Sequence, residues 1–515
     1  MVVDDTAMAT DEVDAEPDLT PEPDDGSGPS WATPVAWIGA IVLFLVASGG
    51  PVTWARAELA DVTGPLISDI WVQAILVVSA GLVLAFSAAG WDLLRHDRLV
   101  LGSVGVLLAV LLFSAAWSLD GTRTVEQWIL LVFASAAALF GGVALERTQV
   151  LTALFLAVHV GILVSVVADL RDWPVALVGD DLAGVFGSTD MMGMIALLAA
   201  AATVMIMVAV LRRTPEERLA IAEEKAARGG GGGGFRMPSM GSINKIRRAA
   251  DLAQRGQSPA SSRSMTPSTP GQAMQFRTMA RAQKRRSRGS LAGVRSSNLM
   301  RIGVSVLLVT VLVLDAFIWW RTQSYGSLFA IVATAIVMLV VGLSLPGAGE
   351  GGRRAAAGIV SVIAAAGAVL LVVFRETVAE QFDRAGTWSG RTTLWDGVLD
   401  GVADRPIHGF GFEAGAEAAG FGTRSGFLQI LVAAGAIGLI ALVWLMALTL
   451  RRTASGALLR PDALGVWVVG MAAYGIAANV NESFVSAWSL PWLLLLFALG
   501  HAVRRREERD GAIAL

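Results

Sequence analysis

Two arginines in a polar segment have the chemistry to hold a phosphate group. Arg391 stands at the start of a stretch with helical spacing, and Arg384 lies seven residues before it. A guanidinium is a planar fork that matches phosphate oxygens, and a helix N-terminus adds to the attraction for an anion. The structural alternative for Arg391 is that it bonds loop carbonyl groups or pairs with Asp383 or Asp396.

Membrane helices must position these arginines. The chain has 515 residues, of which 54% are hydrophobic and only 16% are charged. Apolar runs of about 20 residues recur along it, which is the length that a helix needs to cross a bilayer. The short alternating segments of a membrane barrel are not seen. We therefore predict an all-α polytopic integral membrane protein with about 12 transmembrane helices.

These apolar runs divide the chain into segments. The predicted spans lie near 35–51, 70–90, 99–117, 125–145, 150–168, 190–211, 301–320, 327–346, 355–374, 424–450, 462–480 and 486–503. They place helices 1–6 in 31–211, helices 7–9 in 301–374 and helices 10–12 in 424–503. Residues 1–30 carry ten acidic side chains and no Lys or Arg. This composition predicts a disordered acidic tail and not a cleavable signal peptide.

Charges between the spans predict the orientation of the chain. Arginines recur in 91–98, 347–354, 451–461 and the basic tail 504–515, all on one side in this scheme. Acidic residues fall on the other side, in 58–69 and 169–181. Cytoplasmic loops are enriched in Lys and Arg. We therefore expect a multi-pass protein of the cytoplasmic (inner) membrane with both termini cytoplasmic and 375–423 outside.

Residues 212–300 form a long basic loop on the predicted cytoplasmic side. They hold eighteen Lys or Arg and five acidic residues, with a glycine run at 229–234. This composition favours a disordered linker that acts as a tether and topological determinant. One alternative is that the basic residues of 281–288 attract anionic lipid head groups. A role in nucleic-acid binding is disfavoured because no aromatic residues are interleaved.

Metal and thiol chemistry are not expected. The chain has no cysteine and only four histidines, so thiol nucleophiles and disulfides are excluded and a histidine-rich metal site is disfavoured. Charged residues inside the predicted spans are few, which argues against an ion pathway.

The predicted outer loop, 375–423, carries both arginines. Its apolar and polar residues fall on opposite faces of a short helix, with Leu394, Trp395, Val398, Leu399 and Val402 on one face and Thr392, Thr393, Asp396 and Asp400 on the other. This pattern predicts an amphipathic helix on the membrane surface. Pro406 and several glycines then break regular structure. A loop of this kind can fold back over the bundle and cover a cavity.

Several motifs resemble, in order, those of the O-antigen ligase and polymerase family. SGRTTLW at 389–395, RPIHGFGFEAG at 405–415 and GFLQILVAAGAIGLI at 426–440 resemble the signature of that family. The sequence WSLD at 117–120 resembles its WSxD motif, and 184–193 resembles its GxFxNPNxLG motif with Asn-Pro-Asn replaced. Asn481-Glu482-Ser483 resembles the acidic turn before its last helix. The resemblance covers most of residues 100–500.

The resemblance implies a GT-C-like fold and a glycosyl transfer without metal or cofactor. Members of the family move a glycan from a polyprenyl-diphosphate carrier to an acceptor hydroxyl outside the cytoplasmic membrane. The implied partners are this donor, a glycan or glycolipid acceptor and membrane lipids, with no nucleic acid. Arg391 matches the arginine of the family's SGR motif and is expected to clamp the diphosphate, with Arg384 as a second cation.

Two departures from the family affect the expected site. Arg424 and Ser425 stand where the family often has His-Asn, and Tyr325 stands where it often has the arginine of Ser-Arg-Gly. Arg321, in the preceding turn, could supply that missing charge. Arg424 could bind phosphate or could mark a relative that has lost activity.

Without that histidine, the base that helps the acceptor hydroxyl attack must come from elsewhere. Glu413, in the glycine-rich turn, is the first candidate, followed by Asp396, Glu417 and His408. For Glu413 and His408 the alternative is an ordinary loop side chain in solvent.

Other residues are candidates for holding sugar. Trp388 and Trp395 could stack on sugar rings, or they could anchor the loop at the membrane interface. Glu482, at the outer end of the eleventh predicted span, could contact acceptor sugar or could be an interfacial anchor.

Two rival functions belong to other classes. A twelve-span secondary transporter would favour ionisable groups or broken helices near mid-bilayer in both halves, and a repeat relating the halves. We see no convincing repeat, and polarity is concentrated in one outer loop. The other rival is a catalytically silent relative that holds envelope enzymes through the acidic tail and the basic loop.

Overall fold

The computed structural model describes residues 32–49, 70–87, 90–171, 177–178, 181–186, 188–211, 302–322, 324–344, 391–412, 425–459, 463–479 and 485–514. The described residues are almost all helical, which confirms the predicted all-α class. The exception is a small antiparallel ribbon between β1 (Leu177–Val178) and β2 (Asp181–Leu182), in which Leu177 pairs with Leu182.

The helices follow the predicted spans closely. The α-helices before the basic loop are α1 (Ala32–Ala47), α3 (Ile70–Phe86), α4 (Gly90–His96), α5 (Arg98–Phe113), α6 (Gly121–Ala144), α7 (Arg147–Leu170) and α8 (Thr189–Leu211). Two short 3-10 helices, η2 (Ser114–Trp117) and η3 (Gly184–Phe186), lie between them. After the basic loop come the Ile302–Thr322 helix, α12 (Tyr325–Ser344), α15 (Arg391–Ala403), α17 (Gly426–Leu459), α18 (Ala463–Ala478) and α19 (Leu490–Ala514).

Several of these helices could cross a membrane. In the described ranges, six are long and apolar enough: Arg98–Trp117, Gly121–Ala144, Arg147–Leu170, Thr189–Val210, Ile302–Thr322 and Gly426–Leu458. A seventh is obtained if the bent pair α3 and α4 counts as one span. Three shorter apolar helices are Thr33–Ala47, Gly326–Gly342 and Leu464–Ala478. These lengths support a membrane protein, while the count of twelve spans stays a prediction.

The predicted ninth span, near 355–374, lies outside the described residues and stays a prediction. The tenth is longer than expected, because α17 continues to Leu459, and it is broken at Gly435, where φ is 63° and ψ is −160°.

Side-chain caps fix where two neighbouring helices begin. The Asp97 carboxylate accepts a hydrogen bond from the Val100 backbone N–H at the start of α5, over 3.3 Å. The Asp120 carboxylate accepts one from the Arg123 backbone N–H at the start of α6, over 3.0 Å. Such caps satisfy N–H groups that have no partner inside the helix.

Small residues bring the central helices close together. A Cβ atom on Gly142 of α6 would overlap the Phe497 carbonyl of α19, and one on Gly500 of α19 would overlap the Leu139 carbonyl. Close backbone approach at small residues is a common way for helices to associate in lipid. Trp492 of α19 also donates from Nε1 to the Ser135 hydroxyl of α6 over 2.9 Å, so its buried N–H has a partner. The α6–α19 pair therefore forms the centre of the bundle.

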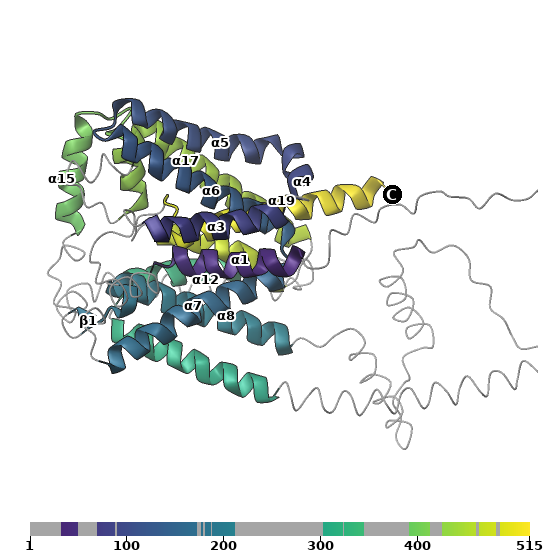
Figure 1. Ribbon diagram of the computed structural model, residues 1–515. Helices are drawn as coiled ribbons and strands as arrows, with labels where there is room; N and C mark the ends of the chain where they lie inside the picture. The colour runs from purple at the N-terminus through teal and green to yellow at the C-terminus, as the bar shows by residue number, and fades with distance from the viewer. Residues whose placement is uncertain are drawn as a thin grey trace, which may run out of the picture.

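The two ends of the bundle differ in composition. In Figure 1 the long helices run alongside one another, α15 lies across their left ends, and α4 and the C-terminal helix are at the right. At the right end, which we call the basic end, Asp97 pairs with Arg452 at 3.3 Å and with Arg506 at 3.7 Å. Three of the four arginine-rich segments therefore converge, as predicted, while 347–354 lies outside the described residues.

Candidate functional site

The opposite end, which we call the motif end, is where loop 404–412 docks on the corner between α5 and α6. Trp117 donates from Nε1 to the His408 carbonyl over 2.8 Å. The Phe412 N–H donates to the Ser114 hydroxyl over 2.9 Å, and its carbonyl accepts from the Thr124 hydroxyl over 3.0 Å. The WSLD motif and the HGFGF motif, almost 300 residues apart, are thus bonded to each other directly.

The same loop fills the break in α17. The Phe410 and Gly411 N–H groups donate to the carbonyls of Val432 and Ala433 over 2.7 and 2.9 Å, and the Ala436 N–H donates to the Pro406 carbonyl over 2.9 Å. In an unbroken helix the Ala436 N–H would bond the Val432 carbonyl instead. Loop 404–412 therefore supplies partners for backbone groups that the break at 435 releases.

Glycine is required on both sides of this contact. At Gly435, where φ is +63°, a Cβ atom would overlap the Ile407 backbone. At Gly409, where φ is +68°, it would overlap the Val432 carbonyl, and at Gly411, where φ is +111°, it would overlap Ser118. Only glycine adopts these backbone angles readily while leaving room for the neighbouring chain.

Helix α15 forms where the amphipathic pattern predicted it. Val398 and Val402 are buried and pack with Val432 of α17, while Asp396 and Asp400 are exposed. Leu399, on the predicted apolar face, is 48% exposed, which a helix that lies on a membrane surface permits. The helix rests on α17 through a narrow valine stripe, and Leu399 lies beside that stripe, not in it.

The predicted site residues on α15 and in its loop have different surroundings. Arg391 is the first residue of α15, as expected, and its side chain lies outside the described part. It precedes Val398 by two helical turns, about 10 Å along the axis. Trp395 is half-buried, and His408 is exposed with its ring edge-on to Trp117 at 5.4 Å between centroids. The structure thus places His408 on the WSLD corner.

A second group of motifs meets at the same end. The Ser324 hydroxyl donates to the Asp190 carboxylate over 2.9 Å, and a Cβ atom on Gly193 would overlap the Ser324 side chain. Asp190 and Gly193 therefore lie against Ser324, at the start of α12. Arg321 is 44% exposed and lies 4.0 Å from Asp169, so it stands at this end with a carboxylate beside it.

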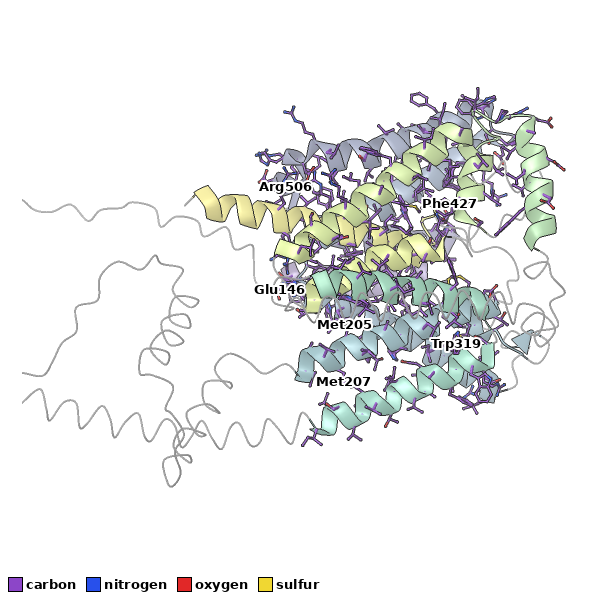
Figure 2. All side chains as sticks on the ribbon, turned by 180° about the vertical axis from the view of Figure 1, so that it is seen from behind. Glu146, Met205, Met207, Trp319, Phe427 and Arg506 are labelled. Carbon is purple, nitrogen blue, oxygen red and sulfur yellow. The ribbon has the colours of Figure 1, made fainter. Side chains whose placement is uncertain are left out.

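Figure 2 shows that the labelled residues Trp319 and Phe427 lie toward one end of the bundle, and Glu146 and Arg506 toward the other. Both groups of motif residues lie at the end of the bundle that is marked by Trp319 and Phe427.

Four predicted site residues, namely Arg384, Glu413, Arg424 and Glu482, lie outside the described residues, so their placement stays a prediction. Glu417 also lies outside them.

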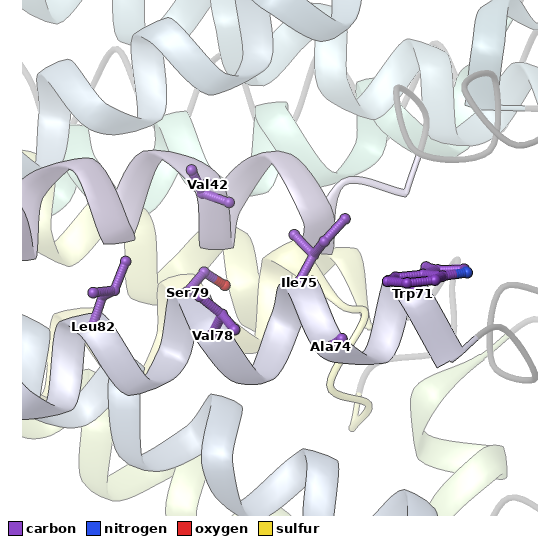
Figure 3. A pocket seen from close by; sticks show the side chains of 7 residues that line it. All are labelled: Val42, Trp71, Ala74, Ile75, Val78, Ser79 and Leu82. Atoms are coloured by element: carbon purple, nitrogen blue, oxygen red, sulfur yellow. The ribbon is translucent and has the colours of Figure 1, made fainter. Parts of the chain in front are cut away.

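An apolar groove of about 280 Å³ runs along α1 and α3 (Figure 3). It is lined by Val42, Trp71, Ala74, Ile75, Val78, Ser79 and Leu82. Its Trp71 end is close to the motif end, because Gln73 of the same turn donates to Glu126 over 2.9 Å. Glu126 lies two residues after Thr124, which bonds Phe412. The groove therefore begins toward the motif end and continues along the side of the bundle.

Sequence reasoning missed three features. Arg405 lies over the Phe410 ring at 5.0 Å, so a cation lies on the docked loop itself. The break at Gly435 was hidden in a continuous apolar run. Asp315 is fully buried beside His159, a pairing that sequence reasoning did not single out. A single acidic residue in the apolar run 302–320 was the signal for it.

Metal binding has no support in the described part of the chain, which contains no group of three or more His, Asp or Glu side chains arranged to hold an ion. The polar groups at the motif end include hydroxyls, aromatic rings, guanidinium groups and the carboxylates of Asp169 and Asp190. Guanidinium groups and rings suit binding of an anion or a sugar, and carboxylates can accept hydrogen bonds from sugar hydroxyls. No protein-family model matches the chain, and no curated protein matches it.

Proposed function

We propose that the chain is a membrane glycosyltransferase that moves a glycan from a polyprenyl-diphosphate donor to an acceptor hydroxyl at the motif end. The observation that carries the proposal is the direct bonding of two distant motifs, WSLD and HGFGF, over the break in α17. Motifs that are far apart in a sequence support a shared function when the fold brings them into contact. Here WSLD and HGFGF are in contact beside α15, the helix that begins with Arg391.

The chemistry follows from the charges. The bond between the anomeric carbon and the diphosphate oxygen breaks as the acceptor oxygen attacks from the opposite side, which inverts the anomeric configuration. The acceptor hydroxyl gives its proton to a carboxylate, with Glu413 as the first candidate, or to water. The leaving diphosphate gains negative charge, and the Arg391 guanidinium stabilises that charge.

The donor also needs a place for its lipid tail. The groove along α1 and α3 is apolar and begins near Glu126, toward the motif end. A prenyl chain in this groove would leave its diphosphate at the motif end. The groove therefore supports a lipid-linked donor over a soluble one.

The first test is replacement of Arg391. Arg391→Ala should lower glycan transfer about a hundredfold or more, the usual effect of losing a group that stabilises transition-state charge. Arg391→Lys keeps the charge without the planar fork and should lie between. The measurement is the envelope glycan of deletion cells that carry each variant, with protein levels checked in the membrane. Arg95→Ala, at an exposed pair with Asp92 at the basic end, is the matched control. Full transfer by Arg391→Ala would contradict the proposal.

A second candidate is a secondary transporter of the same lipid-linked glycan, favoured by the buried pair of His159 and Asp315 and by the broken helix α17. The two candidates differ in where the donor accumulates. In cells with an inactive variant, lipid-linked glycan should gather in the outer leaflet for a transferase and in the inner leaflet for a transporter. Labelling the glycan from outside intact spheroplasts separates the two outcomes.

A further inference from the structure

A polar cluster lies inside the apolar helices, away from the motif end. His159 of α7 and Asp315 of the Ile302–Thr322 helix approach to 3.4 Å between Nε2 and Oδ2. Thr203 of α8 places its hydroxyl 3.3 Å from the same Asp315 oxygen and 3.4 Å from His159 Nε2. All three helices are candidate membrane spans. Ionisable residues inside such helices are costly, and they mark functional sites.

Hydrogen bonds around His159 fix how many protons the cluster needs. Its Nδ1 lies 2.7 Å from the Phe155 carbonyl, which can only accept, so Nδ1 carries a hydrogen. A neutral imidazole with its hydrogen on Nδ1 has a lone pair on Nε2. That lone pair would then face a carboxylate oxygen of Asp315. The contact becomes a hydrogen bond only if one further proton lies between Nε2 and Oδ2.

Thr203 cannot take the place of that proton. A hydroxyl has one hydrogen, and the nearest acceptor for it is the Ala199 carbonyl in the preceding turn, at 2.9 Å. If Thr203 instead donates to Asp315, the Nε2 lone pair of His159 has no donor, and if it donates to His159, Asp315 has none. The cluster therefore needs a proton beyond those its side chains hold when His159 is neutral and Asp315 is ionised.

Burial makes this requirement strong. Asp315 is 0% exposed, and its Oδ1 has no hydrogen-bond partner among the described atoms. A buried carboxylate without a compensating charge is unfavourable. Helices α1, α12 and α18 pack around these three helices. The other titratable residues in the described parts of all six are Arg147, Asp169, Asp190, Arg321, Tyr325 and Tyr474. All of them stand at helix ends except Tyr474, whose hydroxyl donates to the Met194 carbonyl.

We propose that His159 and Asp315, with Thr203 beside them, form a proton-binding site that joins the Ile302–Thr322 helix to α7. The bound proton makes the pair neutral as a whole and completes the hydrogen bond between Nε2 and Oδ2. Loss of the proton leaves a buried negative charge and weakens the junction. The junction matters because the Ile302–Thr322 helix has few other buried contacts: only 17% of its most apolar stretch is buried in the bundle. This inference goes beyond glycosyl transfer and does not rest on it.

The test is nitrogen-15 NMR of the histidine rings in the full-length protein in nanodiscs. The chain has only four histidines, so His159 can be assigned from the spectrum of His159→Gln. We expect a proton in a hydrogen bond at Nε2 together with the hydrogen on Nδ1 at neutral pH. In Asp315→Asn the neutral amide can donate to the Nε2 lone pair, so the Nε2 proton signal should be lost at neutral pH.

Thr310→Val is the matched control, because its exposed hydroxyl bonds only the Val306 carbonyl of the same helix and its loss should leave the His159 signals unchanged. The wild-type spectrum alone decides the proposal if a variant does not fold. An unprotonated Nε2 in the wild-type protein at neutral pH would overturn it. An Nε2 proton signal that is the same in the wild-type protein and in Asp315→Asn at neutral pH would also overturn it.

Discussion

At the basic end of the bundle, the Asp97 carboxylate joins helices through ion pairs, whereas at the motif end loop 404–412 is held by hydrogen bonds that each involve a backbone group. Asp97 binds two arginines from α17 and α19 at the first end. At the second, three backbone bonds and three glycines hold loop 404–412 in the break of α17. Ion pairs between long side chains tolerate small shifts of position, but the backbone contact at 435 does not. The motif end is therefore the end built for a fixed shape.

The largest expected effect comes from Gly435→Ala, which removes the fixed shape. Alanine resists a φ of +63°, and its Cβ would overlap the Ile407 backbone, so the loop must leave the break. We expect a loss of at least about 3 kcal/mol from backbone strain and lost hydrogen bonds. The measurement is the melting temperature of the purified protein in detergent.

Gly456→Ala gives the matched control on the same helix, near the basic end. A Cβ atom there meets nothing within 4 Å. Alanine should be neutral or slightly stabilising, because it is a better helix former than glycine. Equal losses at positions 435 and 456 would show that the two ends do not differ as described.

An intermediate effect is expected for Asp97→Asn at the basic end. Asp97 has a side chain only 6% exposed, while Arg452 and Arg506 are 18% and 51% exposed and can be resolvated in part. We therefore expect a loss of roughly 2 kcal/mol, below the usual cost of breaking a fully buried pair. Melting at low and high salt measures it. Asp92→Asn, at an exposed pair with Arg95, should change little, and an equal loss there would contradict the special role of Asp97.

The smallest effect is expected for Trp117→Phe, which removes one hydrogen bond to the His408 carbonyl. A neutral bond of this kind contributes about 1 kcal/mol, which corresponds to roughly fivefold faster opening of the loop. Limited proteolysis within 404–412 measures this opening. Trp444→Phe also loses one Nε1 bond, to Ser103, away from the loop, and should leave the proteolysis rate unchanged. Equal proteolysis rates for the wild-type protein, Trp117→Phe and Trp444→Phe would show that the Trp117 bond does not hold the loop.

Much of the helical framework could be predicted from the sequence, because apolar runs of membrane length have few alternatives. The start of α15 at Arg391 and its buried valines also follow from local spacing. The break at Gly435 does not, since its sequence, LVAAGAIGLI, resembles any continuous span. Its cause lies in loop 404–412, whose position local spacing cannot give.

The candidate site was predictable in its parts and not in its contacts. Resemblance placed Trp117 and His408 in the same signature, but nothing in either motif says that an indole N–H meets the His408 carbonyl. The buried pair was overlooked for a different reason. His159 and Asp315 lie 156 positions apart, and each is a single ionisable residue in an apolar run, so their pairing emerges only when α7 packs beside the Ile302–Thr322 helix.

The exchange of partners in α17 also bears on how the chain enters a membrane. The Val432 carbonyl that accepts from Phe410, and the Ala436 N–H that donates to Pro406, are the two groups that would bond each other in an unbroken helix. This stretch can therefore be inserted as an ordinary continuous span and can trade that internal bond for the loop afterwards. The Val432 carbonyl and the Ala436 N–H would then have a partner both before and after the loop docks.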